Sequence, residues 1–452
     1  MIKDVKLPIN HLWCFFNGIF NIRILTYKNL TFPLNLKARS LMDRTSGFGP
    51  VDGGSNPSEP ILFHFESIFG ILKTKKEMMN KRRKFLSVAF TLTGTIIGAG
   101  ILGLPHVFAE SGFFIGLSWL IFLGVIIIFV NLYVGEVTLR TKATHQLPGY
   151  SEKYLGLWGK RIMFLALIFG IYSALLAYMI GEGQSLSKLF SGGLEYSLLF
   201  GVGFWIIMTS LLQGGLKRLK SVQYWGVIVI IFIIFLVFFL LFPGVKLENT
   251  TYLNVSKLFF PYGVVLFALL GFTSIPELRR EIGKDRKLLK KSILLGTLIP
   301  IVLYIMFSFV FVGVLGKNIS EVATLSFGGT LGNILLLLGV FTMMTSFFVL
   351  SFSLKDYFIF DLKKRKLIFF YVSIIPLVLY LLVSLFNLAG FITVLGIGGA
   401  ISGGVAGILI LLMNIKAKKK GERKPEYSVP INWFIIVALG LIFLAGIFFE
   451  LF

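Results

Sequence analysis

The stretch GTIIGAGILGLP at residues 94–105 places four glycines and a proline inside an apolar segment long enough to cross a membrane. Glycine in a helix interior costs roughly 1 kcal/mol relative to alanine, and proline costs about 3 kcal/mol. Lipid offers no water to the backbone groups that such a break frees, so an interrupted helix at membrane depth persists only where it is buried in protein or lines a cavity. The stretch therefore predicts a broken first span with a binding site beside it.

The rest of the composition indicates an all-α polytopic membrane protein. Hydrophobic residues make up 56% of the chain and charged residues 14%. The apolar residues gather in blocks of about 20, the length at which a helix crosses the hydrocarbon core. Eleven transmembrane helices are predicted, at residues 86–109, 113–139, 161–187, 195–214, 222–242, 258–282, 290–315, 330–354, 367–386, 391–414 and 432–451.

The basic residues explain the net charge of +23 without a nucleic acid partner. From Lys81 onward, thirty lysines and arginines lie before the first span or in the loops after spans 2, 4, 6, 8 and 10, and four lie on the other side. By the positive-inside rule, this bias predicts a multi-pass protein of the cell membrane with a cytoplasmic N-terminus and an outside C-terminus. The lipid bilayer is the expected partner.

Residues 1–80 read unlike the rest, with no apolar run of membrane-spanning length. The Gly-Ser-Asn-Pro at residues 54–57 is what the T-loop of a transfer-RNA gene encodes when it is translated. One hypothesis is a mis-assigned start, with the native protein beginning at Met78 or Met79. A signal peptide and a disordered cytoplasmic tail are the rivals. The transporter domain is expected at 81–452, with a first repeat at 81–242, a second at 258–414 and an extra helix at 432–451.

A second interruption, LLGFTSIP at residues 269–276, lies in the sixth span. The sixth span crosses in the opposite direction to the first, so spans 1–5 and 6–10 can form a five-plus-five inverted repeat with broken helices 1 and 6. Paired interruptions in corresponding positions of two halves indicate the substrate site of a transporter. Close helix packing is the other interpretation of the glycines in span 1. For the glycines of span 10 (Gly396, Gly398, Gly399, Gly403, Gly404 and Gly407), packing is the favoured interpretation.

The chain direction gives each break a polarity. In span 1, the free carbonyls of the inner half-helix and the free amides of the outer half-helix both face the membrane midplane. Carbonyl ends attract cations and amide ends bind anions, so a zwitterionic amino acid suits the pair. Phe267 and Phe272 flank the second break and are expected to wall a side-chain pocket.

These segments, together with LPGYSEKYLG at 147–156 and the glycine-rich span 10, resemble the amino acid/auxin permease family of the amino acid/polyamine/organocation superfamily. The resemblance covers residues 81–452 and implies the inverted-repeat transporter fold. It implies that the amides of Ala99, Gly100 and Ile101 hold the substrate carboxylate, while carbonyls of Thr95, Ile96 and the second break hold the ammonium. The expected substrate-binding residues are Thr95, Ile96, Gly98, Ala99, Gly100, Ile101, Tyr172, Tyr178, Phe267, Leu269, Gly271, Phe272 and Thr273.

The coupling ion is left open between sodium and protons. In this fold, sodium sites combine carbonyls of the first helix with hydroxyls of the eighth, which gives a candidate site at Gly94, Ile97, Thr342, Thr345 and Ser346. The alternative for the hydroxyls is bonding to their own helix backbone. Many members of the family use protons instead. No other cofactor is expected.

The predicted function is secondary active transport of amino acids, neutral ones because no unpaired charge lies at either break. An amino acid exchanger or sensor on the same fold is the alternative, and a channel is less favoured because no filter motif is present. An enzyme is not expected and no catalytic residues are assigned, since the chain has only four histidines and one cysteine. The oligomeric state is not predicted.

Overall fold

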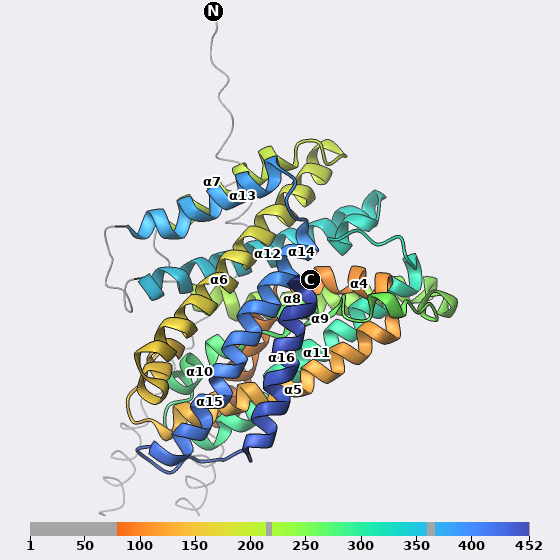
Figure 1. Ribbon diagram of the computed structural model, residues 1–452. Helices are drawn as coiled ribbons and strands as arrows, with labels where there is room; N and C mark the ends of the chain where they lie inside the picture. Colours follow the sequence, from red (N-terminus) through yellow and green to blue (C-terminus); the bar gives the residue numbers. More distant parts are fainter. Residues whose placement is uncertain (1–78, 214–218, 359–366, 452) are drawn as a thin grey trace, which may run out of the picture. The chain divides into compact units, whose positions relative to one another are not determined.

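The computed structural model describes residues 79–213, 219–358 and 367–451, which lie in one compact unit, Lys73–Phe452. These residues form helices and the segments that connect them, and no strand occurs among them (Figure 1). The expectation of a leader at 1–80 falls almost entirely outside the described residues. The helices begin with Met79–Ile96 and continue with α4 (Gly100–Ser111), α5 (Phe113–Arg140), α6 (Leu147–Ser191), α7 (Ser197–Gln213), α8 (Leu219–Leu241), α9 (Tyr262–Leu269), α10 (Ile275–Ile282), α11 (Leu289–Leu315), α12 (Gly329–Asp356), α13 (Ile375–Leu385), α14 (Phe391–Gly398), α15 (Gly404–Lys420) and α16 (Trp433–Leu451).

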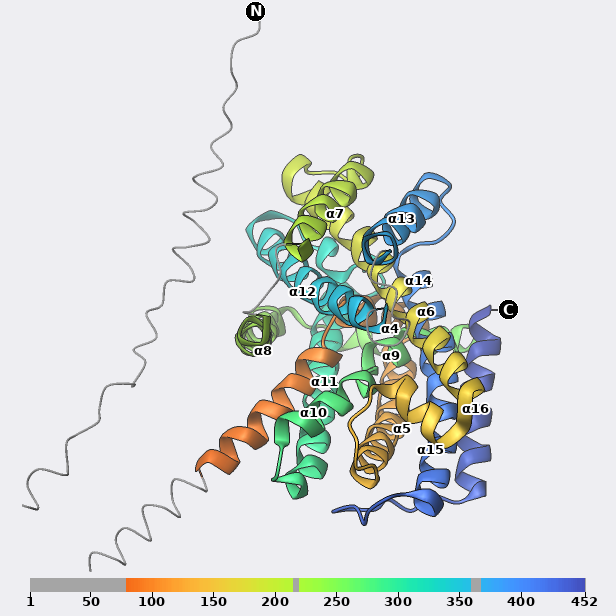
Figure 2. The same cartoon turned by 90° about the vertical axis from the view of Figure 1, so that its left-hand side faces the viewer.

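Eight apolar helical segments among the described residues are long enough to cross a membrane, and nine if the bent pair at the start counts as one span. Two shorter apolar helices, Ser197–Gln213 and Phe370–Leu385, lie where the sequence predicts spans 4 and 9. These two lie together at the top of the molecule in both views (Figures 1 and 2) and contact each other. The chain is therefore a multi-pass membrane protein.

Helix α6 is longer than the predicted third span. It begins at Leu147, in the segment expected to be a loop, and bends at Gly156, whose φ of 83° is left-handed. Pro148 lies in the first turn, where its missing N–H leaves no bond unmade. The helix ends at the left-handed Gly192, whose N–H donates to the Lys188 carbonyl. A loop rich in glycine and proline can thus be helical when both residues stand at helix boundaries.

Both predicted interruptions are present. The helix Met79–Ile96 and α4 meet at a bend of 55°, with residues 97–99 outside either helix. In the sixth span, α9 ends at Leu269, a short 3-10 turn η4 (Phe272–Ser274) follows, and α10 begins at Ile275. Pro276 stands in the first turn of α10, so here again a proline starts a helix at no cost in hydrogen bonds.

The predicted tenth span is also irregular. A π-helical turn, η9 (Gly399–Gly403), separates α14 from α15. A Cβ added at Gly399 would lie 2.2 Å from the Gly263 carbonyl oxygen, and one at Gly407 would lie 2.7 Å from the Phe443 ring. The other four glycines of this span also touch neighbouring helices, so the packing interpretation is confirmed.

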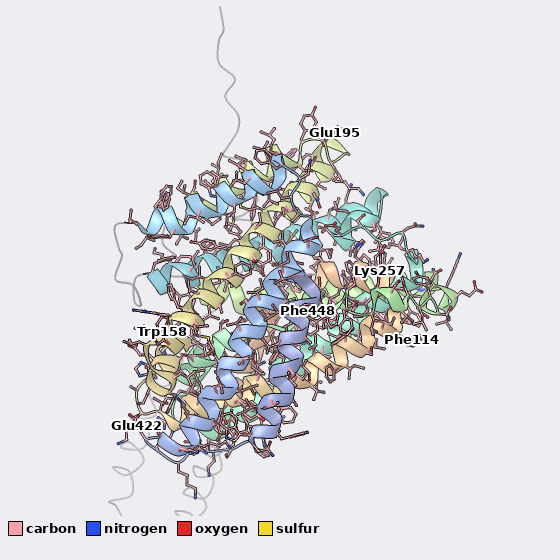
Figure 3. All side chains as sticks on the ribbon, in the orientation of Figure 1. Phe114, Trp158, Glu195, Lys257, Glu422 and Phe448 are labelled. Atoms are coloured by element: carbon pink, nitrogen blue, oxygen red, sulfur yellow. The ribbon has the colours of Figure 1, made fainter. Side chains whose placement is uncertain are left out.

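Loops predicted on one side of the membrane contact one another. At one end, Arg279 donates to the Thr141 carbonyl and Lys153 pairs with Glu422. At the other end, Lys257 pairs with Glu110 and Lys188 donates to the Leu325 carbonyl. Figure 3 shows Glu422 and Lys257 at opposite ends of the helices.

Candidate functional site

The two breaks touch each other. A Cβ added at Gly100, the first residue of α4, would lie 2.5 Å from the Ala268 Cα in α9. In return, a Cβ added at Gly271 would lie 2.5 Å from Cγ1 of Ile96, the last residue of the first helix. A side chain at Gly100 would push α4 away from the α9 backbone, and one at Gly271 would require the Ile96 side chain to move. The half-helix ends that the sequence predicts to be polar therefore lie next to one another.

A tyrosine from α11 bridges the carbonyl ends of the breaks. The Tyr304 hydroxyl lies 2.9 Å from the carbonyl oxygen of Ile96 and 2.9 Å from that of Ala268. The side chain is fully buried. One hydroxyl donates one hydrogen, so two backbone acceptors share a single donor. Tyr304 cannot be assigned to the site from the sequence, because an isolated tyrosine in an apolar helix carries no local signal of which backbone it faces.

A second tyrosine lies at the amide end of the first break. The Tyr178 hydroxyl, from α6, interacts with the backbone of Ala99 and with the Ser346 hydroxyl of α12. A Cβ added at Gly98 would lie 2.9 Å from the Tyr178 hydroxyl oxygen and 3.3 Å from the Ser346 oxygen. The bend at residues 97–99 thus presents its backbone directly to Tyr178.

A cavity of about 80 Å³ lies between the breaks, α6 and span 10. Eight of the thirteen expected substrate residues line it, namely Thr95, Ile96, Gly98, Gly100, Tyr178, Phe267, Phe272 and Thr273. Its wall also includes Ser402, which the sequence analysis did not select. We call it the central cavity.

Five expected residues do not line the central cavity. Ala99, Ile101 and Leu269 are buried beside it, and Gly271 packs on Ile96. Tyr172 faces away, since its hydroxyl donates to the Tyr371 carbonyl at 2.9 Å.

The face that α6 turns to the central cavity follows helical spacing. It consists of Leu167, Gly170, Ile171, Ala174 and Tyr178. Residues three and four apart share one face of a helix, so counting back from Tyr178 recovers the set, and Tyr172 falls off it. The sequence contains this pattern but does not say which tyrosine anchors it.

A larger cavity of about 220 Å³ lies on the other side of the first break, among the first helix, α6, α7, α8 and α12. Four of the five candidate sodium ligands line it: Gly94, Ile97, Thr345 and Ser346. Thr342 is buried outside the cavity wall. Thr95, Tyr178 and Leu350 belong to both cavities, so the two adjoin.

The two threonine hydroxyls of the candidate sodium site bond to their own helix, whereas the Ser346 hydroxyl contacts Tyr178. The Thr345 hydroxyl lies 3.0 Å from the carbonyl oxygens of Phe341 and Thr342, and the Thr342 hydroxyl donates to Leu338 at 2.8 Å. Such bonds use the hydrogen and leave lone pairs on the oxygen. The two threonine hydroxyls therefore bond to their own helix and still have lone pairs with which to bind sodium, so both interpretations made from the sequence stay open.

The chain matches the tryptophan/tyrosine permease family over residues 81–452. It belongs to that family. The expected superfamily is right, but the amino acid/auxin permease family that the motifs resemble is not the family that matches. The chain is 27% identical to tyrosine-specific transport system 1 of Haemophilus influenzae over 388 residues, which cover 79% of this chain and 95% of the relative.

Two further relatives are similar. Glutamine transporter 2 of Aliivibrio fischeri is 24% identical over 383 residues, with 80% of this chain and 97% of the relative covered. The low affinity tryptophan permease of Proteus vulgaris is 25% identical over 248 residues, covering 50% of this chain and 57% of the relative. This member of the tryptophan/tyrosine permease family is an amino acid permease and not an enzyme, as the sequence predicts.

Proposed function

We propose that this permease carries neutral aromatic amino acids, tyrosine and tryptophan first, through the central cavity by alternating access. The contact between the two broken helices carries the proposal, because it brings to one cavity helix-end backbone groups of both polarities whose partners are tyrosine hydroxyls. The amide end, around Ala99, suits the substrate carboxylate, and the carbonyl ends, around Ile96 and Ala268, suit the ammonium.

The chemistry of the cavity wall supports an aromatic side chain. Phe267 and Phe272 contribute aromatic rings to the wall, and Ala174 contributes only a methyl group. No charged side chain is among the described residues that line the central cavity. A charged substrate side chain would therefore lose its hydration without gaining a partner, which disfavours it.

The size of the central cavity supports a conformational cycle. Pockets that hold a small ligand have volumes of about 300–1,000 Å³, whereas this one measures about 80 Å³. Substrate entry therefore requires its walls to separate. We propose that the eleven predicted spans form the five-plus-five repeat and that the two repeats move relative to each other.

Helix packing supports the repeat. α4 packs on α9, α5 on α11, α6 on α12 and α7 on α13. Each of these pairs joins a predicted span to the one five positions later. Such contacts are expected at a two-fold axis, where corresponding elements meet.

Uptake into proteoliposomes tests the substrate class. We expect saturable uptake of radiolabelled tyrosine that unlabelled tryptophan inhibits and that lysine and glutamate do not. Glutamine is the informative competitor, because one relative is named as a glutamine transporter. Inhibition by glutamine but not by tryptophan would overturn the aromatic assignment. Retained uptake without any amino acid inside the vesicles separates a carrier from an obligate exchanger.

We further propose that uptake is driven by a cation, in the cell membrane, with the N-terminus inside. Sodium at Gly94, Ile97, Thr342, Thr345 and Ser346 is one candidate, supported by the cavity that four of these residues share. Replacing sodium by choline at fixed pH abolishes uptake if that site is used. Unchanged uptake assigns the driving role to protons.

A further inference from the structure

Glu182 of α6 is fully buried, with a side chain that has no exposed surface. Neither carboxyl oxygen has a hydrogen-bond partner of normal geometry among the described residues. The group lies close to the backbone of Met344 in α12 and takes part in none of the ion pairs within the described part of the chain. A carboxyl group in this setting is unusual, because buried charges are normally paired.

The elements packed around Glu182 offer no counter-charge. The helices α7 and α14, the turn η6 (Ala323–Ser326) and α12 as far as Leu354 contain no titratable side chain. α13 contributes Tyr380, whose hydroxyl donates to the Ser197 carbonyl. On α6 itself, the neighbours are Tyr178, one turn away, and Lys188, which donates to the Leu325 carbonyl.

Glu136 provides the contrast within the same chain. Its carboxylate is equally buried, yet it accepts from Arg140 at 2.8 Å, the Ser428 hydroxyl at 2.8 Å and the Val429 amide at 2.9 Å. This chain thus satisfies a buried carboxylate fully where it keeps one charged. Glu182 lacks every such partner, so the arrangement around it fits the neutral acid.

Glu182 lies between the substrate site and one end of the molecule. Helices α6 and α12 run along each other, with Tyr178 beside Ser346 and Gly181 beside Met343. Towards the end marked by Lys188 and Leu325, two more buried hydroxyl oxygens, those of Ser185 and Thr324, have no partner among the described residues. Ser185 is three residues from Glu182 and therefore shares its helix face.

We propose that Glu182 is the proton-binding residue of this permease, loaded through the Ser185 and Thr324 hydroxyls from the end marked by Lys188. The proposal rests on the proposed function and names the ion that drives it. The step is a protonation, in which a carboxylate oxygen gains a hydrogen ion and becomes a hydroxyl, with no change in oxidation state. The protein releases the same proton when the interface between α6 and α12 opens to the other side.

Coupling follows from the packing of that interface. An ionised carboxylate without a partner is strongly disfavoured in an apolar interior. The interface seen here therefore forms only after a proton binds. A proton thus selects this conformation, and the proton gradient can bias the direction of the cycle. Tyr178 lies one turn from Glu182 on α6, and Met344 lies two residues from Ser346 on α12. The interface that surrounds Glu182 therefore also holds the contact of Tyr178 and Ser346 with the first break.

The test compares Glu182→Gln with wild type in sodium-free proteoliposomes with the membrane potential clamped. Glutamine mimics the neutral acid and cannot release a proton. With one proton per substrate, a pH difference of one unit, acid outside, drives about tenfold accumulation of tyrosine in wild type, since one unit is a tenfold ratio of proton activity. We expect the variant to accumulate none, with an inside-to-outside ratio of about 1, while it still exchanges internal for external tyrosine.

Glu450→Gln is the matched control. Glu450 is a partly buried carboxyl of α16 that lies against Gly263 and Gly396 and lines neither cavity of the candidate site. Its variant should accumulate tyrosine like wild type. Accumulation by Glu182→Gln at the wild-type ratio overturns the proposal.

A measurement on wild type covers the case in which Glu182→Gln does not fold. Vesicles loaded with a pH-sensitive dye should acidify when tyrosine is added outside. Tyrosine uptake without acidification overturns the proton proposal and leaves the permease assignment intact. Absence of all tyrosine uptake in wild type overturns the proposed substrate instead.

Discussion

Two tyrosine hydroxyls occupy the backbone groups that we propose hold the substrate. Tyr178 lies at the amide end of the first break, and Tyr304 lies between the carbonyl ends of both breaks. A hydroxyl accepts from an amide as a carboxylate does and donates to a carbonyl as an ammonium does. Substrate binding at these ends therefore requires the two side chains to share or leave their partners.

Tyr304→Phe tests this at the residue scale. The variant keeps the ring and leaves the Ile96 and Ala268 carbonyls without their donor, which should lower the free energy of unfolding by about 1–3 kcal/mol. We also expect weaker tyrosine binding, because the breaks lose the contact that aligns them. Thermal unfolding in detergent and the half-saturation concentration for uptake measure the two effects.

Tyr172→Phe is the control for that substitution. Its hydroxyl binds the Tyr371 carbonyl outside the central cavity, so its removal should leave the half-saturation concentration unchanged. Equal affinity in wild type and Tyr304→Phe would show that the hydroxyl plays no part in the site.

The limit of sequence reasoning is also clearest at single residues. The glycines and prolines of both breaks can be recognised in the sequence, because these residue types destabilise a helix interior whatever their surroundings. The sequence does not show which of Tyr178 and Tyr172 lines the cavity, since both lie in one apolar helix and only tertiary contacts decide which face meets the break. Tyr304 and Ser402 stand far from the breaks in sequence, and only folding brings them to the cavity.

At the scale of elements, the glycines of the first break differ in how readily they tolerate a side chain. Gly98 faces the end of a side chain, the Tyr178 hydroxyl, whereas Gly100 faces the Ala268 backbone. A side chain tip can shift, and a packed backbone cannot without displacing its helix. Large substitutions at Gly100, such as Gly100→Leu, therefore test packing of α4 on α9 as much as carboxylate binding.

The pair Gly98→Ala and Gly100→Ala separates the two roles. Gly98→Ala should fold and bind tyrosine more weakly, because its methyl group displaces the Tyr178 hydroxyl. Gly100→Ala should lose about 1–3 kcal/mol of stability or more through overpacking. Size-exclusion profiles measure the folding of each variant, and a binding assay measures its affinity for tyrosine. Gly203→Ala is the control, since a methyl group there meets no neighbouring atom. Unaltered binding by Gly98→Ala would contradict the position assigned to the substrate carboxylate.

The predicted spans agree with the structure where the apolar segment is long. They differ from it where the helices are short or where a proline or glycine sets a helix boundary. Ser197–Gln213 and Phe370–Leu385 are shorter than a full crossing. The segment from Leu147 became helical because Pro148 and Gly156 both lie where a helix tolerates them. Composition alone does not distinguish a proline that starts a helix from one that ends it.

At the scale of the whole molecule, three interfaces take part in the cycle that we propose. The breaks meet at the central cavity, α6 meets α12 around Glu182, and corresponding helices of the two predicted repeats pack in pairs. The loops gather in two groups at opposite ends, which agrees with the separation that the charge bias predicts. In this proposal the substrate occupies the central cavity, and the cavity opens during transport.

Accessibility of one engineered thiol tests that claim most directly. Ala174 lines the central cavity on α6, and the native chain has a single cysteine, Cys14, which Cys14→Ser removes. In that background, Ala174→Cys should react with a small thiol reagent, the reaction should block uptake, and tyrosine or tryptophan should slow it. Glu195→Cys, in the exposed loop between α6 and α7, should react at the same rate with and without tyrosine. Modification of Ala174→Cys at the same rate with and without tyrosine, or modification that leaves uptake intact, would contradict the account.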